Sequence, residues 1–434
     1  KPLVEKLLRE QEKSRADGFM YLNGILTKVE NKKNALRFVL EIAKPYDGMP
    51  EAHFIIAHAA FMAGDKKLAE SELDVVERLN PSWETSALFK GYMLARDWPE
   101  KASSFYQTFL EKNPKSNEVR LEYAKTLTNL KDYEAAKKEF LKLVNGSLAS
   151  PEISLTVALL SLELNDLNLA ETYLNQSLER GYKNPEQIFI YLAKIYKERK
   201  KYQEAISYLN KITSGEFFVE SKLLAAQLIA ENESIENAIL SLDPYQNLTV
   251  EDRIRILQLK VSLLYNSGKK TESFDLIKDE EKNFQNSPEF KFEYAMLAEK
   301  LGNAVLSEQL LKEAIKLKPD YALAYNALGY SYADRNVNLA EAKKNIEIAL
   351  SIEPKNHYIL DSMGWVYYKL GDLNLAHEFI KKAFAVQEDP EIAAHLGEVL
   401  WKQGKKEDAQ KIWLDSLKKY PGNSIVSETL KRLK

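Results

Sequence analysis

The sequence predicts an all-α chain arranged as an α-solenoid of about twelve helical hairpins, and three observations lead to that prediction. Small residues recur about every 34 positions along nearly the whole chain, which indicates a repeated structural unit. A second series of small residues precedes the first by about twelve positions in most units. Prolines and glycines fall at regular places between the two series. The first series consists of Ala35, Ala69, Ala102, Ala136, Ala170, Ala205, Ala238, Ser273, Ser307, Ala342, Ala376 and Ala409.

The two small positions of each unit predict two helices that pack closely against each other. A larger side chain at such a place would hold the helix axes apart. The second series includes Ala57, Ala124, Gly364 and Gly397, and Gly329 lies one residue out of register. Each unit is therefore expected to be one antiparallel helical hairpin.

Proline and glycine mark the limits and the turns of the predicted hairpins. Pro81 and Pro354 follow second helices, whereas Pro151 and Pro390 stand at the start of first helices, where the missing amide hydrogen costs nothing. A set of glycines lies between paired helices, where a left-handed C-terminal cap reverses the chain. These turn glycines are Gly64, Gly268, Gly302, Gly371 and Gly404.

The repeat register predicts an order of domains along the chain. Residues 1–15 are expected to form an N-terminal helix, 16–218 a first repeat array and 254–423 a second array, with a capping helix over 424–434. The pattern weakens over 219–253, where a turn glycine is missing and Pro244 interrupts the register, so we predict a degenerate repeat and a bend there. Units are expected to start at Ala16, Pro50, Trp83, Asn117, Pro151, Glu186, Val219, Ile254, Pro288, Ala322, His357 and Pro390.

Composition excludes several classes of protein. The 434 residues include 61 basic and 64 acidic side chains, and the formal net charge of -3 provides no general attraction for nucleic acid. The absence of cysteine excludes disulfides, thiolate metal sites and cysteine nucleophiles. The most apolar stretch, Ala52 to Ala63, is too short to cross a bilayer and contains two histidines. The chain begins at Lys1 and not at Met, so we expect an original N-terminus to be missing.

The sequence carries no arrangement of residues that predicts an enzyme. The five histidines are scattered without metal-ligand spacing, and Lys381 stands where a zinc-protease helix beginning at His377-Glu378 would need its second histidine. Neither a phosphate-binding glycine loop nor a nucleophile elbow is found. We therefore predict a non-enzymatic protein that uses no cofactor and no metal.

Three segments resemble the tetratricopeptide repeat (TPR): ALAYNALGYSYADRNVNLAEAKKNIEIALSIEP from Ala322, HYILDSMGWVYYKLGDLNLAHEFIKKAF from His357 and PEIAAHLGEVLWKQGKKEDAQKIWLDSLKKYP from Pro390. The resemblance implies a right-handed superhelix whose first helices line a concave groove that binds protein. It also implies that positions 2, 5, 9, 12 and 13 of each unit face that groove. The protein-binding groove residues predicted in this way are Asn326, Tyr330, Asp334, Tyr358, Asp361, Trp365, Tyr368, Lys369, Glu398, Trp401 and Lys402.

The aromatic residues of this set exceed what repeat packing needs. Rigid aromatic side chains contribute large contact areas at small entropic cost, so we interpret the additional rings as recognition groups for a partner. The alternative is that they pack against the next turn of the superhelix or against the terminal helix.

The N-terminal repeats predict a second, apolar groove. A partner helix or the first helix of the chain itself is expected to cover it, because a soluble monomer seldom leaves such a strip exposed. Its residues are Phe54, His58, Phe61, Met62, Leu94, Leu121, Leu155, Leu159 and Leu162.

The runs ALGYSYADR, ILDSMGWVYYKLG and DPEIAAHLGEVLWKQGKKEDAQKIW are similar to a family of bacterial TPR outer-membrane lipoproteins, and EAHFIIAHAAFMAGD and LFKGYMLARD extend the similarity toward the N-terminus. This family includes the adaptor of the periplasmic carboxyl-terminal processing protease. The resemblance implies a location at the periplasmic face of the outer membrane, a lipid anchor that this chain lacks, and a processing protease and cell-wall hydrolases as partners.

Together these observations predict a non-enzymatic adaptor or scaffold of the bacterial cell envelope that presents protein partners to a periplasmic processing protease. The alternative is a structural assembly subunit of an envelope complex with no role in proteolysis.

Overall fold

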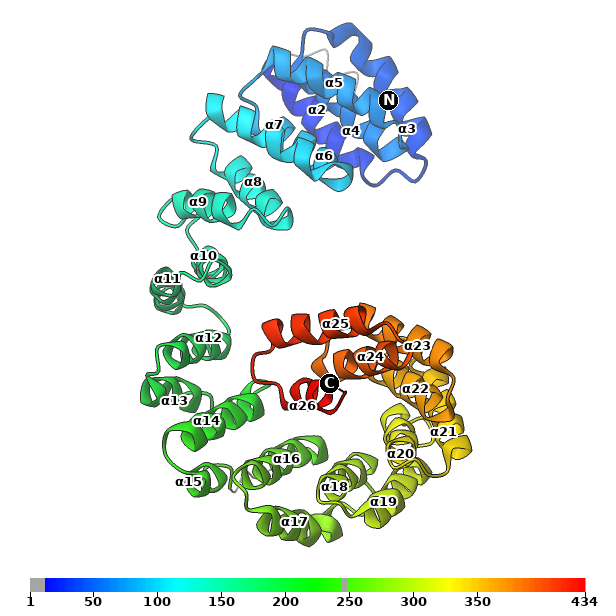
Figure 1. The fold of residues 1–434 in the computed structure, drawn as a ribbon. Helices are drawn as coiled ribbons and strands as arrows, with labels where there is room; N and C mark the ends of the chain where they lie inside the picture. The colour runs from blue at the N-terminus through cyan, green and yellow to red at the C-terminus, as the bar shows by residue number, and fades with distance from the viewer. Residues whose placement is uncertain (1–11, 244–247, 434) are drawn as a thin grey trace. The chain divides into compact units, whose positions relative to one another are not determined.

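The computed structural model describes residues 12–243 and 248–433, and every regular element within them is a helix. These helices follow one another as twelve consecutive pairs and a final single helix (Figure 1). The prediction of an all-α solenoid of about twelve hairpins is thus confirmed. Two compact units divide between Phe217 and Phe218.

The helices of the first unit begin close to the predicted starts of the repeats. Pro50, Asn117 and Pro151 begin first helices as expected, and α2 is helical from Glu12, the first described residue, through the predicted start at Ala16. Residues 1–11 of the predicted N-terminal helix lie outside the described residues. The elements are α2 (Glu12–Leu26), α3 (Lys32–Ala43), the 3-10 helix η1 (Lys44–Tyr46), α4 (Pro50–Ala63), α5 (Lys66–Leu79), α6 (Glu84–Asp97), α7 (Pro99–Lys112), α8 (Asn117–Asn129), α9 (Tyr133–Leu143), α10 (Pro151–Glu163), α11 (Leu167–Glu179), α12 (Pro185–Glu198) and α13 (Tyr202–Asn210).

The second unit continues the same alternation. Its first hairpin has the shortest second helix, α15, and the predicted bend over 219–253 stays a prediction. The elements are α14 (Phe218–Asn232), α15 (Ile235–Leu240), α16 (Val250–Asn266), α17 (Lys270–Asp279), the 3-10 helix η2 (Glu280–Asn283), α18 (Pro288–Lys300), α19 (Ala304–Leu317), α20 (Ala322–Asp334), α21 (Leu339–Ile352), α22 (His357–Leu370), α23 (Leu373–Val386), α24 (Pro390–Lys402), α25 (Lys406–Lys419) and α26 (Ser424–Leu433).

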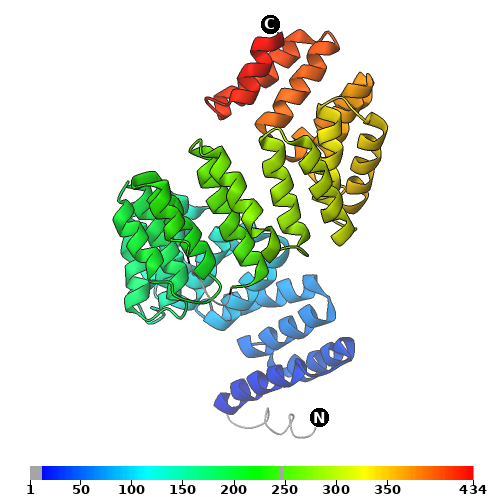
Figure 2. The same cartoon turned by 90° about the horizontal axis from the view of Figure 1, so that it is seen from below.

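First and second helices lie on opposite sides of the second unit. Helices α16, α18, α20, α22 and α24 follow one another along one side, and their partners α17, α19, α21, α23 and α25 follow along the other (Figure 1). Figure 2 shows the same succession of paired helices after a 90° turn. The terminal helix α26 packs against α24 and α25, and it buries Val426. The side made by the first helices is called the first-helix face below.

Small residues allow the two helices of a hairpin to touch. The recurring residues from Ala69 to Ala409 are almost completely buried, as predicted. A Cβ added to Gly364 would lie 2.3 Å from Cγ1 of Ile380 on the partner helix, and one added to Gly397 would lie 2.1 Å from Nε1 of Trp413. The backbone of each first helix therefore rests directly on the side chains of its partner.

Nine of the twelve turns between paired helices contain a residue in the left-handed region. The predicted turn glycines have φ between 79° and 87°, which confirms their role. Four of the units without a glycine there use Lys131, Asn165, Lys200 and Asn336, whose φ values lie between 56° and 61°. The tight reversal thus persists where the residue type is unfavourable, because helix packing on both sides determines it.

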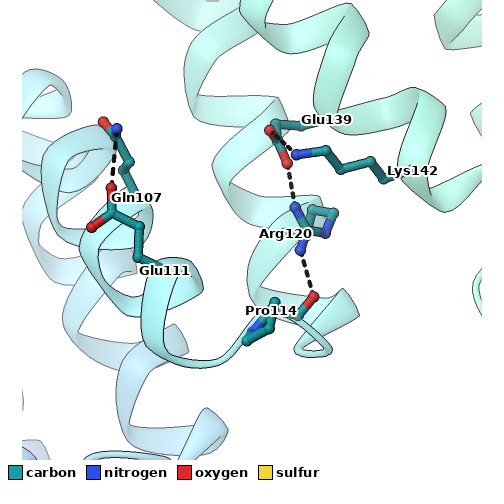
Figure 3. Close-up of polar contacts among 6 residues, drawn as sticks. All are labelled: Gln107, Glu111, Pro114, Arg120, Glu139 and Lys142. Atoms are coloured by element: carbon teal, nitrogen blue, oxygen red, sulfur yellow. Dashed lines mark hydrogen bonds and ion pairs between the residues drawn. The ribbon is translucent and has the colours of Figure 1, made fainter.

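A buried ion pair connects the two helices of the α8/α9 hairpin (Figure 3). Arg120 on α8 pairs with Glu139 on α9, and its second terminal nitrogen donates to the carbonyl of Pro114 at 2.6 Å. Lys142 binds the other carboxylate oxygen of Glu139 at 2.6 Å. The guanidinium thereby holds the first helix, its partner and the preceding connection together.

Candidate functional site

The predicted groove residues come together on the first-helix face of α20, α22 and α24. Asn326 and Tyr330 lie one helical turn apart on α20, and Asp361 and Trp365 repeat that spacing on α22. Because α20 packs against α22 and α22 against α24, side chains from three repeats share one surface.

Trp365 lies at the centre of this surface and is only 6% exposed. Its ring stacks on His395 of α24, with ring centroids 4.1 Å apart and planes 19° apart, and on Tyr368 at 4.8 Å. The Nζ of Lys369 lies 5.0 Å from the centroid of the Trp365 ring. The indole is thus held rigidly by three neighbours.

Hydrogen bonds connect the three helices around Trp365. Asp361 Oδ2 lies 2.8 Å from His395 Nδ1, which ties α22 to α24. The hydroxyl of Tyr330 donates to Glu391 at 3.1 Å and so reaches from α20 across to α24. The side chains on this part of the first-helix face are therefore bonded to one another.

The terminal helix adds a further connection. Tyr368 donates to Glu398 Oε1 at 2.8 Å, and Arg432 of α26 binds the other oxygen of Glu398 at 2.5 Å. Glu398 is 4% exposed, so Arg432 compensates a charge that has lost most of its water. Tyr368 and Glu398 thus lie beside the terminal helix, as the alternative interpretation of the additional rings expects.

Burial and charge set the protonation of this cluster. Burial alone would lower the pKa of His395, but the charge of Asp361 and the hydrogen bond to it, with Glu391 and Glu398 nearby, raise that pKa above 6.5. Burial, followed by the charge of Glu391, raises the pKa of Tyr330, so this hydroxyl stays a neutral donor. The carboxylates around His395 therefore favour the protonated form of its imidazole in a nearly dry environment.

The predicted groove residues differ in exposure. Asp361, Trp365 and Glu398 are buried, and Asn326, Tyr330, Tyr368, Lys369 and Trp401 are partly buried. Tyr358 is 51% exposed, and Asp334 and Lys402 are exposed as well. Trp401 packs toward the second helix, with its ring 5.9 Å from that of Trp413. Their role in binding a partner stays a prediction.

The nine residues of the predicted apolar N-terminal groove are distributed among several cores between repeats. Phe54, Leu94 and Leu155 are buried, and the other six, His58, Phe61, Met62, Leu121, Leu159 and Leu162, are partly buried. Phe54, Leu94, Leu121 and Leu155 each belong to a different hydrophobic cluster. Residues 1–11, the greater part of the first helix that was considered as a cover, lie outside the described residues.

An aromatic cluster around Phe89 was missed from the sequence. The rings of Phe54, His58 and Phe61 on α4 all pack edge-on against Phe89 of α6 at 5.1 to 5.7 Å. Burial, and secondarily the charge of Lys32, lowers the pKa of His58. Phe89 falls outside the repeat positions taken to face the groove, so the sequence carried no signal for it.

A cavity on the first-helix face between α16 and α18 was also missed. It encloses about 100 Å³, and its walls include Gln258, Ser262 and Tyr265 from α16 with Glu293 and Met296 from α18. Applying the groove positions to the unit that begins at Ile254 would have pointed to Gln258, Ser262 and Tyr265.

Residues 12–243 and 248–433 contain neither a candidate metal site nor a candidate membrane span. No group of three or more His, Asp or Glu side chains is placed to hold a metal ion there. None of the helices in this part of the chain has the length and apolar character needed to cross a membrane.

Comparison with known proteins identifies repeats in both units. Models described as tetratricopeptide repeat match residues 362–424 and residues 118–145. A TPR repeat-containing protein of Pseudomonas aeruginosa is 29% identical over 207 residues, which are 48% of this chain and 35% of that protein. One of Methanocaldococcus jannaschii is 36% identical over 77 residues, or 18% of this chain and 14% of that protein. The chain thus spans 35% or less of the length of either relative.

Solved structures with similar helical repeats include a thermophilic TPR protein of Thermus thermophilus. It is 21% identical with a TM-score of 0.38, over 41% of this chain and 97% of that one. A structure of Naa15/Naa10 bound to HypK-THB is 15% identical with a TM-score of 0.41, over 88% of this chain and 73% of that one.

Proposed function

We propose that this tetratricopeptide-repeat protein is a non-enzymatic adaptor that binds protein partners on the first-helix face of α20, α22 and α24. The observation that supports this most is the rigid cluster around Trp365, which fixes side chains of three helices relative to one another. A surface that is ordered before binding loses little conformational entropy when a partner docks.

Exposed groups on the same three helices are the proposed contacts. Tyr358 offers an exposed aromatic ring, and Asp334 and Lys402 offer charges of opposite sign. Tyrosine and charged groups around a rigid centre are typical of protein interfaces. The buried residues Asp361, Trp365 and Glu398 act by holding the surface in shape.

The test is retention of partner proteins by the immobilised full chain from extracts of the source cells. Tyr358→Ser combined with Lys402→Glu is expected to weaken retention of specific partners about tenfold, or 1.4 kcal/mol. Val386→Ser is the matched control, since Val386 is 56% exposed and lies on the second helix α23. Equal retention by the double variant and the control would contradict the proposed face.

The finer proposal is that the partners are a periplasmic carboxyl-terminal processing protease and its cell-wall hydrolase substrates, at the outer membrane and through a lipid anchor outside this chain. It rests on the resemblance of the runs between Ala327 and Trp413. An adaptor of this kind raises the local concentration of substrate at the protease.

The finer proposal is tested with purified protease and hydrolase. Adding the chain is expected to accelerate cleavage of the hydrolase, and the double variant at Tyr358 and Lys402 is expected to remove the acceleration. An unchanged rate would contradict the protease role and leave general partner binding intact. A permanent complex without exchange of subunits would instead favour an assembly subunit.

A further inference from the structure

The cavity between α16 and α18 is lined by the partly buried acid Glu293 and by both apolar and polar side chains. Val261, Met296 and Leu297 supply apolar surface, and Gln258, Ser262 and Asn266 supply polar groups at one side. Ser262 and Asn266 are exposed, so the cavity opens to solvent along α16. It is large enough to take the end of one side chain and too small for a folded element.

Glu293 is the acidic group of this cavity, and its charge is poorly compensated. Burial raises the pKa of Glu293, and a hydrogen bond with Gln258 and the charge of Lys300 only partly oppose that effect. The amide of Gln258 is neutral, and Lys300 acts on the carboxyl group through its charge alone. A partly buried carboxyl group with such neighbours gains most from a cation that arrives with its own hydrogen-bond donors.

The cation already present is engaged elsewhere. Lys300 Nζ lies 5.9 Å from the centroid of the Tyr265 ring, and Lys270 Nζ lies 5.6 Å from the same centroid. The Tyr265 hydroxyl donates to the Lys300 carbonyl at 3.3 Å, which fixes the ring beside α18. The ammonium groups of Lys270 and Lys300 thus lie near the Tyr265 ring, and neither forms an ion pair with the carboxyl group of Glu293.

We propose that this cavity binds the side chain of a lysine from a partner protein, with the ammonium group on the Glu293 carboxylate and the methylene stem along Met296 and Val261. A lysine fits because its stem is slender and apolar and its charge is a compact point with three donors. This inference rests on the proposed adaptor function. It adds that a lysine of the partner is recognised at a second place, outside the cluster around Trp365.

The experiment uses the full chain labelled with ¹³C at the methyl groups of its six methionines. The Met296 signal is identified by its loss in Met296→Leu. Three matched peptides are titrated: Gly-Gly-Lys-Gly-Gly, the same peptide acetylated on the lysine Nζ, and Gly-Gly-Arg-Gly-Gly. The lysine peptide is expected to shift the Met296 signal in a saturable way, and the other two are expected to bind at least tenfold more weakly.

Two variants test the role of the carboxyl group. Glu293→Gln keeps the shape and the hydrogen bonding of the neutral acid, and it is expected to weaken binding of the lysine peptide at least tenfold. Glu347→Gln is the control, because Glu347 is an exposed carboxylate on the second helix α21, and it is expected to leave binding unchanged. Circular dichroism of both variants verifies that the helices are retained.

Several outcomes would overturn the inference: equal binding of the acetylated peptide, equal binding of the arginine peptide, or an unchanged affinity in a folded Glu293→Gln. If the lysine peptide fails to bind while capture of partners still depends on Tyr358 and Lys402, the cavity proposal fails and the adaptor proposal stands. If the lysine peptide binds but capture of partners does not depend on Tyr358 and Lys402, the cavity proposal stands and the proposed adaptor face fails.

Discussion

At the scale of single residues, glycine has opposite effects on stability at two helical positions of this chain. Gly364 lies where the partner helix touches its backbone, and an added Cβ would approach Ile380 Cγ1 at 2.3 Å and the Ala376 carbonyl oxygen at 3.0 Å. Gly24 lies inside α2, and no atom is found within 4 Å of an added Cβ. The first glycine is required by packing, and the second only weakens its helix.

We therefore expect Gly364→Ala and Gly24→Ala to change stability in opposite directions. Gly364→Ala should lower the free energy of unfolding by about 1–3 kcal/mol through overpacking. Gly24→Ala should raise it by about 0.5–1 kcal/mol, because alanine has the better helix propensity. Urea denaturation followed by circular dichroism measures both. Equal effects of the two substitutions would refute the close contact at Gly364.

The left-handed turn residues give a second prediction at this scale. Lys200 has φ of 57° between α12 and α13, where a side chain costs roughly 1–2 kcal/mol. Lys200→Gly removes that cost. Part of the gain is lost because glycine increases the conformational entropy of the unfolded chain. The substitution should stabilise the protein by about 0.5–1 kcal/mol, as measured by the urea midpoint. A loss of stability would show that the Lys200 side chain makes a compensating contact.

At the scale of the hairpin, one polar arrangement occurs twice in the first unit. Arg120 pairs with Glu139, and His53 with Glu72 at 2.5 Å, and both pairs are separated by 19 residues. Each cation also bonds a backbone carbonyl six residues before it. The same place in two repeats therefore uses a buried cation to connect both helices with the preceding loop.

Removing one partner of the Arg120 pair should be costly. Arg120→Met leaves Glu139 buried with Lys142 as its remaining cation, and we expect a loss of about 2–4 kcal/mol. Replacing both partners, in Arg120→Met with Glu139→Leu, should recover much of that loss because no charge stays buried. The three variants are compared by urea denaturation. A double variant less stable than the single one would contradict this account.

His53 makes its hairpin sensitive to pH where Arg120 does not. Burial would lower the pKa of His53, but the hydrogen bond to Glu72, the Asp47 carbonyl and both carboxylate charges raise it above 6.5. A group whose pKa is raised by folding stabilises the fold below its ordinary pKa, and that contribution is lost as the pH rises through the raised value. The wild type should therefore lose stability relative to His53→Gln as the pH increases from 6.5.

The difference in stability between wild type and His53→Gln reports on His53 alone, because His395, whose pKa is also raised, is present in both proteins. Thermal unfolding at a series of pH values measures it. A difference that stays constant with pH would mean that His53 does not titrate in the folded chain.

At the scale of the whole chain, the extensive contacts between described helices lie within a hairpin or between hairpins adjacent in sequence, so damage should stay local. Gly364→Ala is expected to accelerate amide hydrogen exchange in α20 to α25 and to leave α4 to α7 unchanged. Mass spectrometry of exchanged peptides measures both regions. Uniform acceleration along the chain would indicate that the repeats unfold as one cooperative body.

The repeat period predicted the number of hairpins, the buried small residues and the turn glycines correctly. These features depend on local spacing, and Gly364 or Gly371 can be placed from sequence position alone. The start of α16 at Val250 and not at Ile254 was missed, since Thr249 caps the helix by accepting from the Asp252 amide. A capping hydrogen bond of that kind competes with the repeat register and is decided by local geometry.

The sequence by itself determined which residues the repeat brings to one face, because helical periodicity assigns each position a direction. Only the tertiary structure decided whether those side chains are exposed to solvent or covered by neighbouring side chains. Trp365 became a buried centre because His395 and Tyr368 stack on it, and Glu293 came to border a cavity because α16 and α18 leave space between them. Contacts of this kind depend on how adjacent repeats pack, and residue spacing carries no record of that geometry.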